Sequence, residues 1–303
     1  MNKKVLLTGA NGFIGSHLLK LLVESQYSVV ATKRAKSDLW RCQDIVDKVK
    51  WIDIDGADWK NKCIQQKPDI IIHAAWIGVD AKNRDNWENQ STNIDLLMDI
   101  LYVASATESK HFIGFGSQAE YGYIDGIVSE DDETKPTTAY GAIKLASSNI
   151  IRKFCSDNNI RWHWLRLFSF FGEKESENWL IPSCIKRMQN ELEMDFTEGE
   201  QRYAYLYIHD LVKAILELIA KDVESAIFNI SSSQCITIRQ LIETIARRVN
   251  PDFKLNFGAL PYRSGQSMHI QGNISKFEQL VSPIDSDNFD KKLQKTITYY
   301  LEQ

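Results

Sequence analysis

The sequence predicts an α/β fold, in which a doubly wound parallel sheet is combined with a smaller carboxy-terminal α/β lobe. Short apolar runs rich in β-branched residues alternate with runs of helical periodicity as far as Ile230. A glycine-rich turn joins the first predicted strand to the first predicted helix, the order that a dinucleotide site requires. Several predicted strands end in small, polar or aromatic residues, at the edge where such sheets bind ligands.

The composition indicates a soluble globular protein that binds neither nucleic acid nor membranes. Its 303 residues suffice for one large domain or for a domain with a smaller lobe. The net charge of -4 gives no polyanion-binding signature, no apolar run reaches membrane-spanning length, and we expect no signal peptide before the first strand. The five cysteines are scattered and never spaced as Cys-x-x-Cys, which predicts reduced thiols, a cytoplasmic location and no metal site.

The segment after the first predicted strand has the glycine spacing of a phosphate-binding loop. Strand 5–8 leads into Gly9-x-x-Gly12-x-x-Gly15, and helical periodicity follows. Gly9 permits a sharp turn, Gly12 lets the backbone approach a pyrophosphate, and Gly15 lets the helix pack close to the strand. An ordinary glycine loop is the alternative. The position between strand and helix favours a cofactor site, with free helix amides for the phosphates, formed by Gly9, Asn11, Gly12, Phe13, Ile14 and Gly15.

The second predicted strand, 28–32, ends in Lys33-Arg34. A site specific for NAD usually has an acidic residue at this place, which binds the ribose 2′-hydroxyl. Two cations suit a 2′-phosphate instead, and the Arg34 guanidinium is able to bind it with two hydrogen bonds. A solvated basic loop is the alternative. The pair favours NADP(H), with NAD(H) possible.

Further strands are predicted at 51–55, 69–76, 111–116, 161–168 and 226–230. Residues at or near their carboxyl ends are expected beside the ligand: Asp53, Ile54, Ala74, Ala75, Ser117 and Phe168. Asp53 and Ile54 are placed to flank an adenine, and the small Ala74 and Ala75 leave room for a cofactor ring. After about residue 172 the alternation becomes less regular. We therefore predict a dinucleotide-binding domain of 1–171 and about 203–232, and a substrate-binding lobe of about 172–202 and 233–303.

The segment 137–144 predicts the start of a helix that presents a tyrosine and a lysine on one face. Pro136 interrupts the chain, and Thr137 or Thr138 is able to cap the free amides. Tyr140 and Lys144 are four residues apart, so their side chains project from the same side of the helix. An ammonium near a phenol stabilises the phenolate and makes the tyrosine a usable proton donor nearer neutral pH. The alternative is an exposed aromatic ring beside a solvated lysine.

Taken together, these motifs resemble the extended short-chain dehydrogenases/reductases of the nucleotide-sugar-modifying type, the NAD-dependent epimerase/dehydratase family. The resemblance covers nearly the whole chain and rests on Gly9-x-x-Gly12-x-x-Gly15, His73-Ala74-Ala75, Asn93, Ser117-x-x-x-Tyr121-Gly122, Tyr140-x-x-x-Lys144, Leu165-Arg166, Gly199-x-x-Arg202, Tyr207-Ile208-His209-Asp210 and Arg263. It implies a Rossmann domain that binds a nicotinamide cofactor, a smaller lobe that covers a sugar carrying dTDP, CDP or GDP, and a homodimer.

The resemblance also implies roles for single residues. Tyr140 is the acid/base on the sugar oxygen, Lys144 lowers its pKa and holds the nicotinamide ribose, and Ser117 donates a hydrogen bond to the same oxygen. Both Tyr140 and Lys144 therefore count as cofactor-binding as well as catalytic. Arg202 and Arg263 match positions that bind the substrate diphosphate, with a plain surface position as the alternative for each. The expected substrate-binding residues are Trp76, Ser117, Gln118, Ser169, Arg202 and Arg263.

Departures from the family pattern exclude some of the reactions that the family catalyses. Dehydratases of this type use an Asp-Glu pair where this chain has Gln118-Ala119, and decarboxylating relatives need the glutamate. Fucose-synthase-like epimerase/reductases need a cysteine at the position of Ala119. These departures leave simple keto reduction, its reverse, or 4-epimerisation.

We therefore predict NADPH-dependent reduction of an NDP-4-keto-6-deoxyhexose, which would make a deoxysugar for a surface polysaccharide such as a lipopolysaccharide O-antigen. The basic Lys33-Arg34 pair favours reduction over 4-epimerisation, because it suits an exchangeable NADPH. An NDP-hexose 4-epimerase or dehydrogenase with tightly bound NAD is the nearest alternative. A non-catalytic protein that senses the dinucleotide is the alternative from another class.

Overall fold

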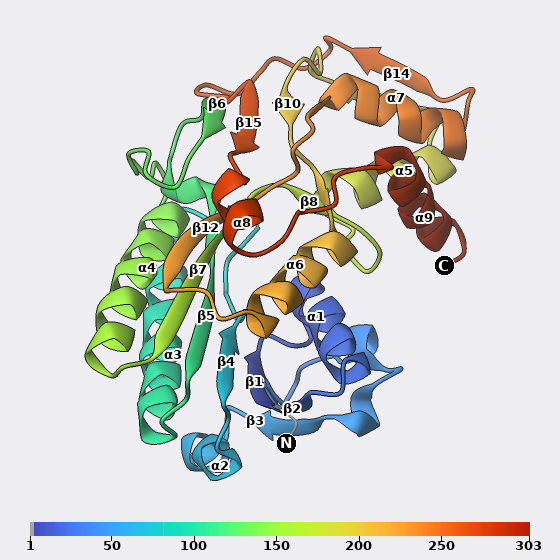
Figure 1. The fold of residues 1–303 in the computed structure, drawn as a ribbon. Helices are drawn as coiled ribbons and strands as arrows, with labels where there is room; N and C mark the ends of the chain where they lie inside the picture. The colour runs from blue at the N-terminus through green and yellow to red at the C-terminus, as the bar shows by residue number, and fades with distance from the viewer. Residues whose placement is uncertain (1–2, 81) are drawn as a thin grey trace. The chain divides into compact units, whose positions relative to one another are not determined.

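The computed structural model describes residues 3–80 and 82–303, and its largest sheet has the predicted doubly wound order. Met1 and Asn2 lie outside the described residues. The expectation that no signal peptide precedes the first strand falls on this segment. The sheet is ordered β12-β7-β5-β4-β1-β2-β3 (Figure 1). Its strands are β1 (Lys4–Thr8), β2 (Ser28–Lys33), β3 (Lys50–Asp53), β4 (Ile70–His73), β5 (His111–Ser117), β7 (Arg161–Leu167) and β12 (Ala226–Ile230). The strands from β3 to β7 pair in parallel, which confirms the predicted class of fold.

Helices cover both faces of this sheet, and apolar residues follow one another in its central strands β1 and β4. The helices are α1 (Phe13–Glu24), α2 (Trp59–Gln66), α3 (Trp87–Ala106), α4 (Ala139–Asp157) and α6 (Ile208–Ala220). Leu6, Ile71 and Phe112 pack in one buried cluster with residues of α2, α3 and α4. Their neighbours Leu7 and Ile72 are equally inaccessible to solvent, and they point to the opposite face. Figure 1 places α3 and α4 side by side along one face.

A second set of elements forms three small sheets and four helices within residues 123–131, 168–211 and 229–303. The strands are β6 (Asp125–Val128), β8 (Phe170–Phe171), β9 (Glu193–Phe196), β10 (Arg202–Tyr203), β11 (Leu206–Tyr207), β13 (Ile236–Thr237), β14 (Lys254–Phe257) and β15 (His269–Gly272). The helices are α5 (Leu180–Asn190), α7 (Ile238–Val249), α8 (Ser275–Leu280) and α9 (Phe289–Leu301). Sheet β13-β10-β15-β6 is the largest, β11 pairs with β8, and β14 pairs with β9.

The chain divides into two compact units. Unit 1 comprises residues 1–122, 132–167 and 212–228, and unit 2 comprises 123–131, 168–211 and 229–303. The sequence pattern did not anticipate that residues 123–131 belong to unit 2. They do so because β6 pairs in parallel with β15, a partner far away in the sequence. The assignment of cofactor binding to one unit and substrate binding to the other stays a prediction.

No helix among the described residues has both the length and the apolar character of a membrane span. Within residues 3–80 and 82–303, no group of three or more His, Cys, Asp or Glu side chains is arranged to hold a metal ion.

Two histidines buried at the start of β5 and in β7 predict loss of stability in acid. His111 Nε2 lies 2.7 Å from His163 Nδ1, and His163 Nε2 lies 2.9 Å from the Glu224 carbonyl oxygen. Burial lowers the pKa of His163 from 6.5 to about 4, and it lowers the pKa of His111 as well. Because the unfolded chain binds these protons more readily, stability is present above pH 6.5 and is lost as the pH falls toward 4.

We expect His163 alone to account for about 2 kcal/mol of this loss between pH 7 and pH 4.5, and urea unfolding at these two pH values measures it. His163→Gln removes the titrating group, so its free energy of unfolding should fall less between the two pH values than that of the parent protein. An equal fall in both proteins would contradict the prediction.

Candidate active site

The glycine loop has the backbone geometry of a phosphate cradle. Gly9 follows β1 with a φ of +67°, and a Cβ on it would lie 2.6 Å from the backbone nitrogen of Ala75. A Cβ on Gly15 would lie 2.0 Å from the Gly9 carbonyl oxygen, so α1 packs too close to the turn for any side chain. A Cβ on Gly12 would meet only that same oxygen within 4 Å. The space beside Gly12 is therefore open, and the first amides of α1, which begins at Phe13 without a side-chain cap, are available to an anion.

The other residues predicted for this part of the site lie around the loop. Asn11 donates through Nδ2 to the Asp38 carbonyl oxygen at 3.3 Å, and the Phe13 ring packs edge-on against His17. Ile14 follows in the first turn of α1 and is partly buried. Ala74 and Ala75 come directly after β4, and the Ala75 N–H donates to Thr8 Oγ1 at 3.1 Å. The residues present thus fit a dinucleotide, because small side chains and free amides converge at the ends of β1 and β4.

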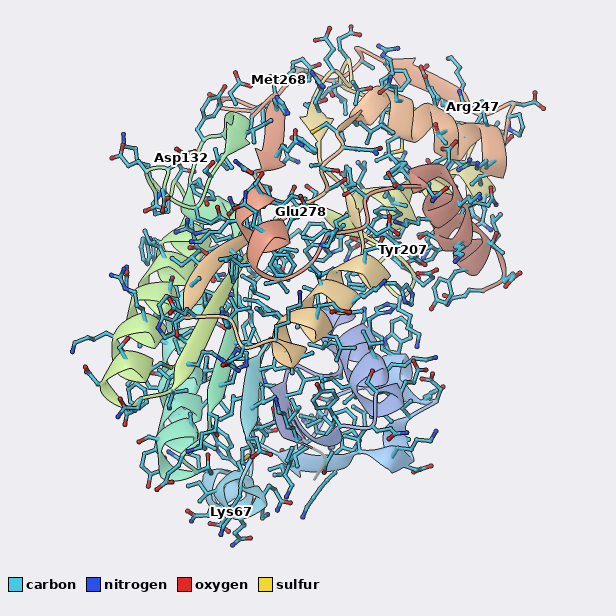
Figure 2. The ribbon with its side chains drawn as sticks, in the orientation of Figure 1. Lys67, Asp132, Tyr207, Arg247, Met268 and Glu278 are labelled. Carbon is cyan, nitrogen blue, oxygen red and sulfur yellow. The ribbon has the colours of Figure 1, made fainter. Side chains whose placement is uncertain are left out.

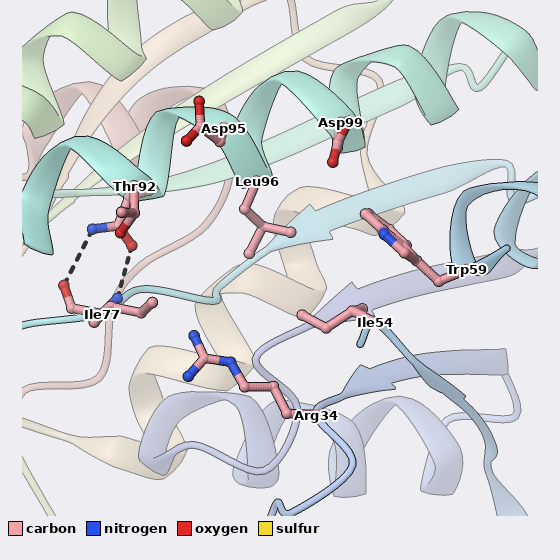
Figure 3. A pocket seen from close by; sticks show the side chains of 9 residues that line it. Arg34, Ile54, Trp59, Ile77, Thr92, Asp95, Leu96 and Asp99 are labelled. Atoms are coloured by element: carbon pink, nitrogen blue, oxygen red, sulfur yellow. Dashed lines mark hydrogen bonds between the residues drawn. The ribbon is translucent and has the colours of Figure 1, made fainter. Parts of the chain in front are cut away.

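A cavity of about 240 Å³ lies at the ends of β2 and β3 (Figure 3). It is lined by Arg34, Ile54, Trp59, Ile77, Thr92, Asn93, Asp95, Leu96 and Asp99. Arg34 and Ile54 were both predicted for the cofactor site, and the structure brings them together here. Lys33 and Asp53, predicted with them, end their strands without lining the cavity, and Asp53 Oδ1 instead accepts the Asp55 N–H at 2.9 Å. The apolar wall formed by Trp59 and Leu96 carried no recognisable sequence signal.

The Asn93 side chain is hydrogen-bonded to the loop after β4. Its side chain is buried, Oδ1 accepts the Ile77 N–H at 2.8 Å, and Nδ2 donates to the Ile77 carbonyl oxygen at 3.2 Å (Figure 3). This pair of bonds sets the path of the backbone along one side of the cavity.

The structure brings Ser117, Tyr140 and Lys144 together. Ser117 ends β5 and is buried, and its Oγ accepts the Ala119 N–H at 3.1 Å. Tyr140 lies in the first turn of α4, which Thr138 caps by accepting the Gly141 N–H at 3.1 Å. Ser117 faces the Tyr140 side chain and lowers the pKa of its phenol.

Lys144 lies one turn further along α4 and is buried. Its Nζ donates to the Phe115 carbonyl oxygen at 2.6 Å and lies 5.8 Å from the centre of the Tyr140 ring. The two side chains therefore point the same way, as the four-residue spacing predicts. The chemical roles of all three residues stay predictions.

Burial dominates the electrostatics of Tyr140 and Lys144. It raises the pKa of the Tyr140 phenol above 10, against the charge of Arg84 and the polar Ser117 side chain, which both lower it. Burial also lowers the pKa of Lys144 to about 7, with Glu120 opposing and Arg84 reinforcing the change. The cation with the largest effect on the Tyr140 pKa is therefore Arg84, not Lys144.

Trp76 lies against both of these side chains. Its ring is edge-on to Tyr140 at 6.1 Å between centres, and Lys144 Nζ lies 3.4 Å from the ring centre. Its Nε1 donates to Gln90 Oε1 at 3.0 Å, which fixes the plane of the indole. The sequence predicted Trp76 as a substrate residue, and this role stays a prediction.

A buried polar network lies directly behind Ser117. The Glu120 carboxylate accepts the Ser117 N–H at 2.8 Å, Trp164 Nε1 at 2.9 Å and Arg166 Nε at 2.9 Å. Arg166 also donates to the Tyr121 hydroxyl at 2.9 Å. Glu120 and Arg166 are both inaccessible to solvent, and burial raises the pKa of Glu120. Sequence analysis missed Glu120, although Ser-x-x-Glu is the spacing of a capping box and the structure contains that box.

Gln118 and Ala119, which follow Ser117 directly, form a short 3-10 turn with Glu120. Gln118 Oε1 is buried and makes no hydrogen bond with any residue that the structure describes. An amide oxygen without a partner at this place is able to accept a hydrogen bond from a ligand hydroxyl, but it is unable to exchange protons.

The remaining predicted residues lie in unit 2. A Cβ on Gly272 would lie 2.6 Å from the Phe168 ring, and the Ser169 carbonyl oxygen accepts the Leu206 N–H at 2.9 Å. Arg202 in β10 donates through its backbone N–H to Met268, which is labelled in Figure 2. Arg263 is exposed, and its charge opposes the burial that raises the pKa of Tyr203, the neighbour of Arg202. Their contacts with a ligand stay predictions.

Comparisons with known proteins support the interpretation of these motifs. The chain is 26% identical to the CDP-abequose synthase of Salmonella muenchen over 292 residues, which cover 92% of each protein. It is 26% identical to the dTDP-4-dehydro-6-deoxyglucose reductase of Escherichia coli over 271 residues, which cover 84% of each. Among solved structures, the UDP-N-acetylglucosamine 4-epimerase of Methanobrevibacter ruminantium M1 shares the fold. It superposes with a TM-score of 0.89 at 22% identity and covers 100% of this chain and 99% of its own.

A family model describes three quarters of the sequence. The model of the NAD dependent epimerase/dehydratase family matches residues 5–231, which include the glycine loop and the Ser117, Tyr140 and Lys144 cluster. The chain belongs to the NAD dependent epimerase/dehydratase family.

Proposed function

We propose that this protein is an NADPH-dependent reductase that acts on the keto group of an NDP-4-keto-6-deoxyhexose. The observation that carries the proposal is the cluster of Ser117, Tyr140 and Lys144, with no acid/base pair at the two positions directly after Ser117. Gln118 and Ala119 stand at that place, and neither side chain transfers protons. Two relatives, named as a CDP-abequose synthase and a dTDP-4-dehydro-6-deoxyglucose reductase, support a 6-deoxysugar substrate.

The residues of the chain act on the carbonyl oxygen of the substrate. A bound NADPH supplies the hydride. Tyr140 donates its phenolic proton to the oxygen as negative charge develops there, and Ser117 Oγ donates a hydrogen bond to the same atom. Lys144 holds the nicotinamide ribose, and the free Gln118 Oε1 accepts a hydrogen bond from a sugar hydroxyl. Arg202 and Arg263 bind the diphosphate of the nucleotide.

The proposed preference for NADPH depends on Arg34, which lines the cavity at the ends of β2 and β3. We expect Arg34→Gln to weaken NADPH binding by about 10- to 100-fold, because a charge-assisted pair with a 2′-phosphate is lost. Affinity for NADH should not change, because NADH has no 2′-phosphate. Titration of the reduced-nicotinamide fluorescence without sugar measures both affinities.

Lys36→Gln provides the matched control, since it removes an exposed cation from the same loop. Equal losses of NADPH affinity in the two variants would mean that general charge, rather than Arg34, attracts the phosphate. Equal affinity of the parent protein for NADH and NADPH would contradict the cofactor preference.

The proposed reaction is tested by incubating the protein with NADPH and a panel of NDP-4-keto-6-deoxysugars that carry dTDP, CDP or GDP. Absorbance at the reduced-nicotinamide band is followed, and consumption with one member of the panel is the expected result. No oxidation with any of them would reject the proposal. The 4-epimerase or dehydrogenase alternative predicts NAD that copurifies with the protein and conversion without net consumption. The dinucleotide-sensing alternative predicts binding without turnover.

We also propose a homodimer. Met98 and Tyr102 leave large apolar surface exposed on α3, which is consistent with a helical interface between two copies. Sedimentation of the protein at micromolar concentration measures the state, and a monomer at every concentration would contradict it.

A further inference from the structure

Tyr140 is in contact with a cation that no sequence motif marks. Arg84 lies in the segment between β4 and α3, and its guanidinium carbon is 4.7 Å from the centre of the Tyr140 ring. The same segment is bonded to the first turn of α4. The Arg84 carbonyl oxygen accepts the Tyr140 N–H at 2.8 Å, and Asp85 Oδ1 accepts the Ala139 N–H at 3.1 Å. Tyr140 and Arg84 are thus held together through both backbone and side chain.

The guanidinium itself is anchored. Its Nε donates to the Val79 carbonyl oxygen at 3.1 Å, which leaves the terminal nitrogens directed elsewhere. The Arg84 guanidinium lies over the Tyr140 ring. The guanidinium is therefore a cation held in place beside the phenol of Tyr140.

The other charged groups that face Tyr140, Glu120 and Lys144, are each held by partners other than Tyr140. Ser117 and Glu120 approach from β5 and the turn after it, and the Glu120 carboxylate is paired with Arg166 at 2.9 Å. Lys144, from α4 itself, is directed at the Phe115 carbonyl oxygen and the Trp76 ring. Arg84 is closer to the Tyr140 ring centre than Lys144 is, at 4.7 Å against 5.8 Å.

We propose that Arg84 is a positioning residue for Tyr140, which orients the phenol and stabilises the phenolate that remains after proton donation. In that step the Tyr140 O–H bond breaks, a new O–H bond forms on the substrate oxygen, and the negative charge left on Tyr140 faces the guanidinium. The kinetic consequence depends on the proposed reduction, whereas the electrostatic effect on Tyr140 does not. The charge of Arg84 lowers the pKa of Tyr140 against the effect of burial.

The electrostatic effect is measured on the protein without dinucleotide. Tyrosine labelled with ¹³C at the ζ carbon is incorporated, the Tyr140 resonance is assigned by its loss in Tyr140→Phe, and its shift is followed with pH. We expect Arg84→Gln to raise the pKa of Tyr140 by about 1–3 units, the usual effect of removing one nearby opposite charge. Arg84→Lys keeps a charge and should restore most of the lowering. Arg152→Gln removes an exposed cation from the solvent side of α4 and should have no effect.

The NMR titration alone tests the proposal. An unchanged pKa of Tyr140 in Arg84→Gln would overturn it, and so would an equal shift of that pKa in Arg152→Gln. Circular dichroism checks the fold of each variant, and the Arg84→Lys variant keeps the comparison available if Arg84→Gln does not fold.

The second measurement is the pH dependence of kcat for reduction. Because the protonated phenol is the active form, kcat falls as Tyr140 ionises, and Arg84→Gln should move this alkaline limb to higher pH by the same amount as the titration. We expect kcat to fall and KM to stay nearly constant. If no substrate is turned over but the titration shifts, the proposed function fails and this inference stands. If reduction proceeds and the titration does not shift, this inference fails alone.

Discussion

Replacing Tyr140 with phenylalanine is expected to lower kcat for the proposed reduction by about 10²- to 10⁴-fold, the contribution of one positioned general acid. The variant keeps the ring that contacts Arg84 and Trp76, so the surroundings of the hydroxyl change little. What disappears is the phenolic proton, on the side chain that faces Ser117. Initial rates at saturating substrate give kcat, and fluorescence titration gives the affinity for NADPH, which should change by less than about threefold.

Tyr123→Phe is the matched control, because it removes the same hydroxyl from an exposed tyrosine. Its kcat should equal that of the parent protein. A Tyr140→Phe variant that retains a tenth or more of the parent rate would mean that another group, or solvent, supplies the proton.

Removing one partner of the Glu120–Arg166 pair should have the largest effect on stability. Both side chains are buried, and the carboxylate also accepts hydrogen bonds from Ser117 and Trp164. We expect Glu120→Ala or Arg166→Met to lower the free energy of unfolding by about 3–5 kcal/mol, because a buried charge is left without compensation. Urea unfolding followed by circular dichroism measures the change.

The double variant distinguishes the ion pair from general packing. If the charge left behind is the main cost, Glu120→Ala combined with Arg166→Met should be less destabilised than the sum of the single variants. Lys153→Met, which breaks the exposed pair with Asp157 on α4, should cost at most about 1 kcal/mol. Additive single effects would contradict the interpretation of the pair as a coupled unit.

The large sheet was predictable because its central strands β1, β4 and β5 are buried on both faces and have a local signal. Ile70–His73 is a continuous apolar run up to its last residue, and buried parallel strands have this composition whatever surrounds them. Thr138 was likewise predictable as the cap of α4, since capping depends on residues a few positions apart. β6 was not predictable, because its strand character comes from pairing with β15.

Some residues of the candidate site were likewise predictable from local sequence, and others were not. Gly9, Ser117, Tyr140 and Lys144 were found because their spacing is fixed by a turn, a strand end and a helix face. Arg84 was missed because only the tertiary fold brings the segment between β4 and α3 onto the first turn of α4. The direction of the Tyr140 pKa was also beyond the sequence, since it depends on burial that the local pattern does not report.

The division into two units has a consequence for dissecting this protein. The chain passes from one unit to the other after residues 122, 131, 167, 211 and 228, so neither unit is a continuous stretch. Truncation after Leu167 would delete β12 from the edge of the large sheet, and a fragment starting at Phe168 would lack β6. Exchanging unit 2 between relatives would therefore require grafting 123–131 together with the carboxy-terminal segments. We expect nested deletions to give insoluble fragments rather than an isolated domain.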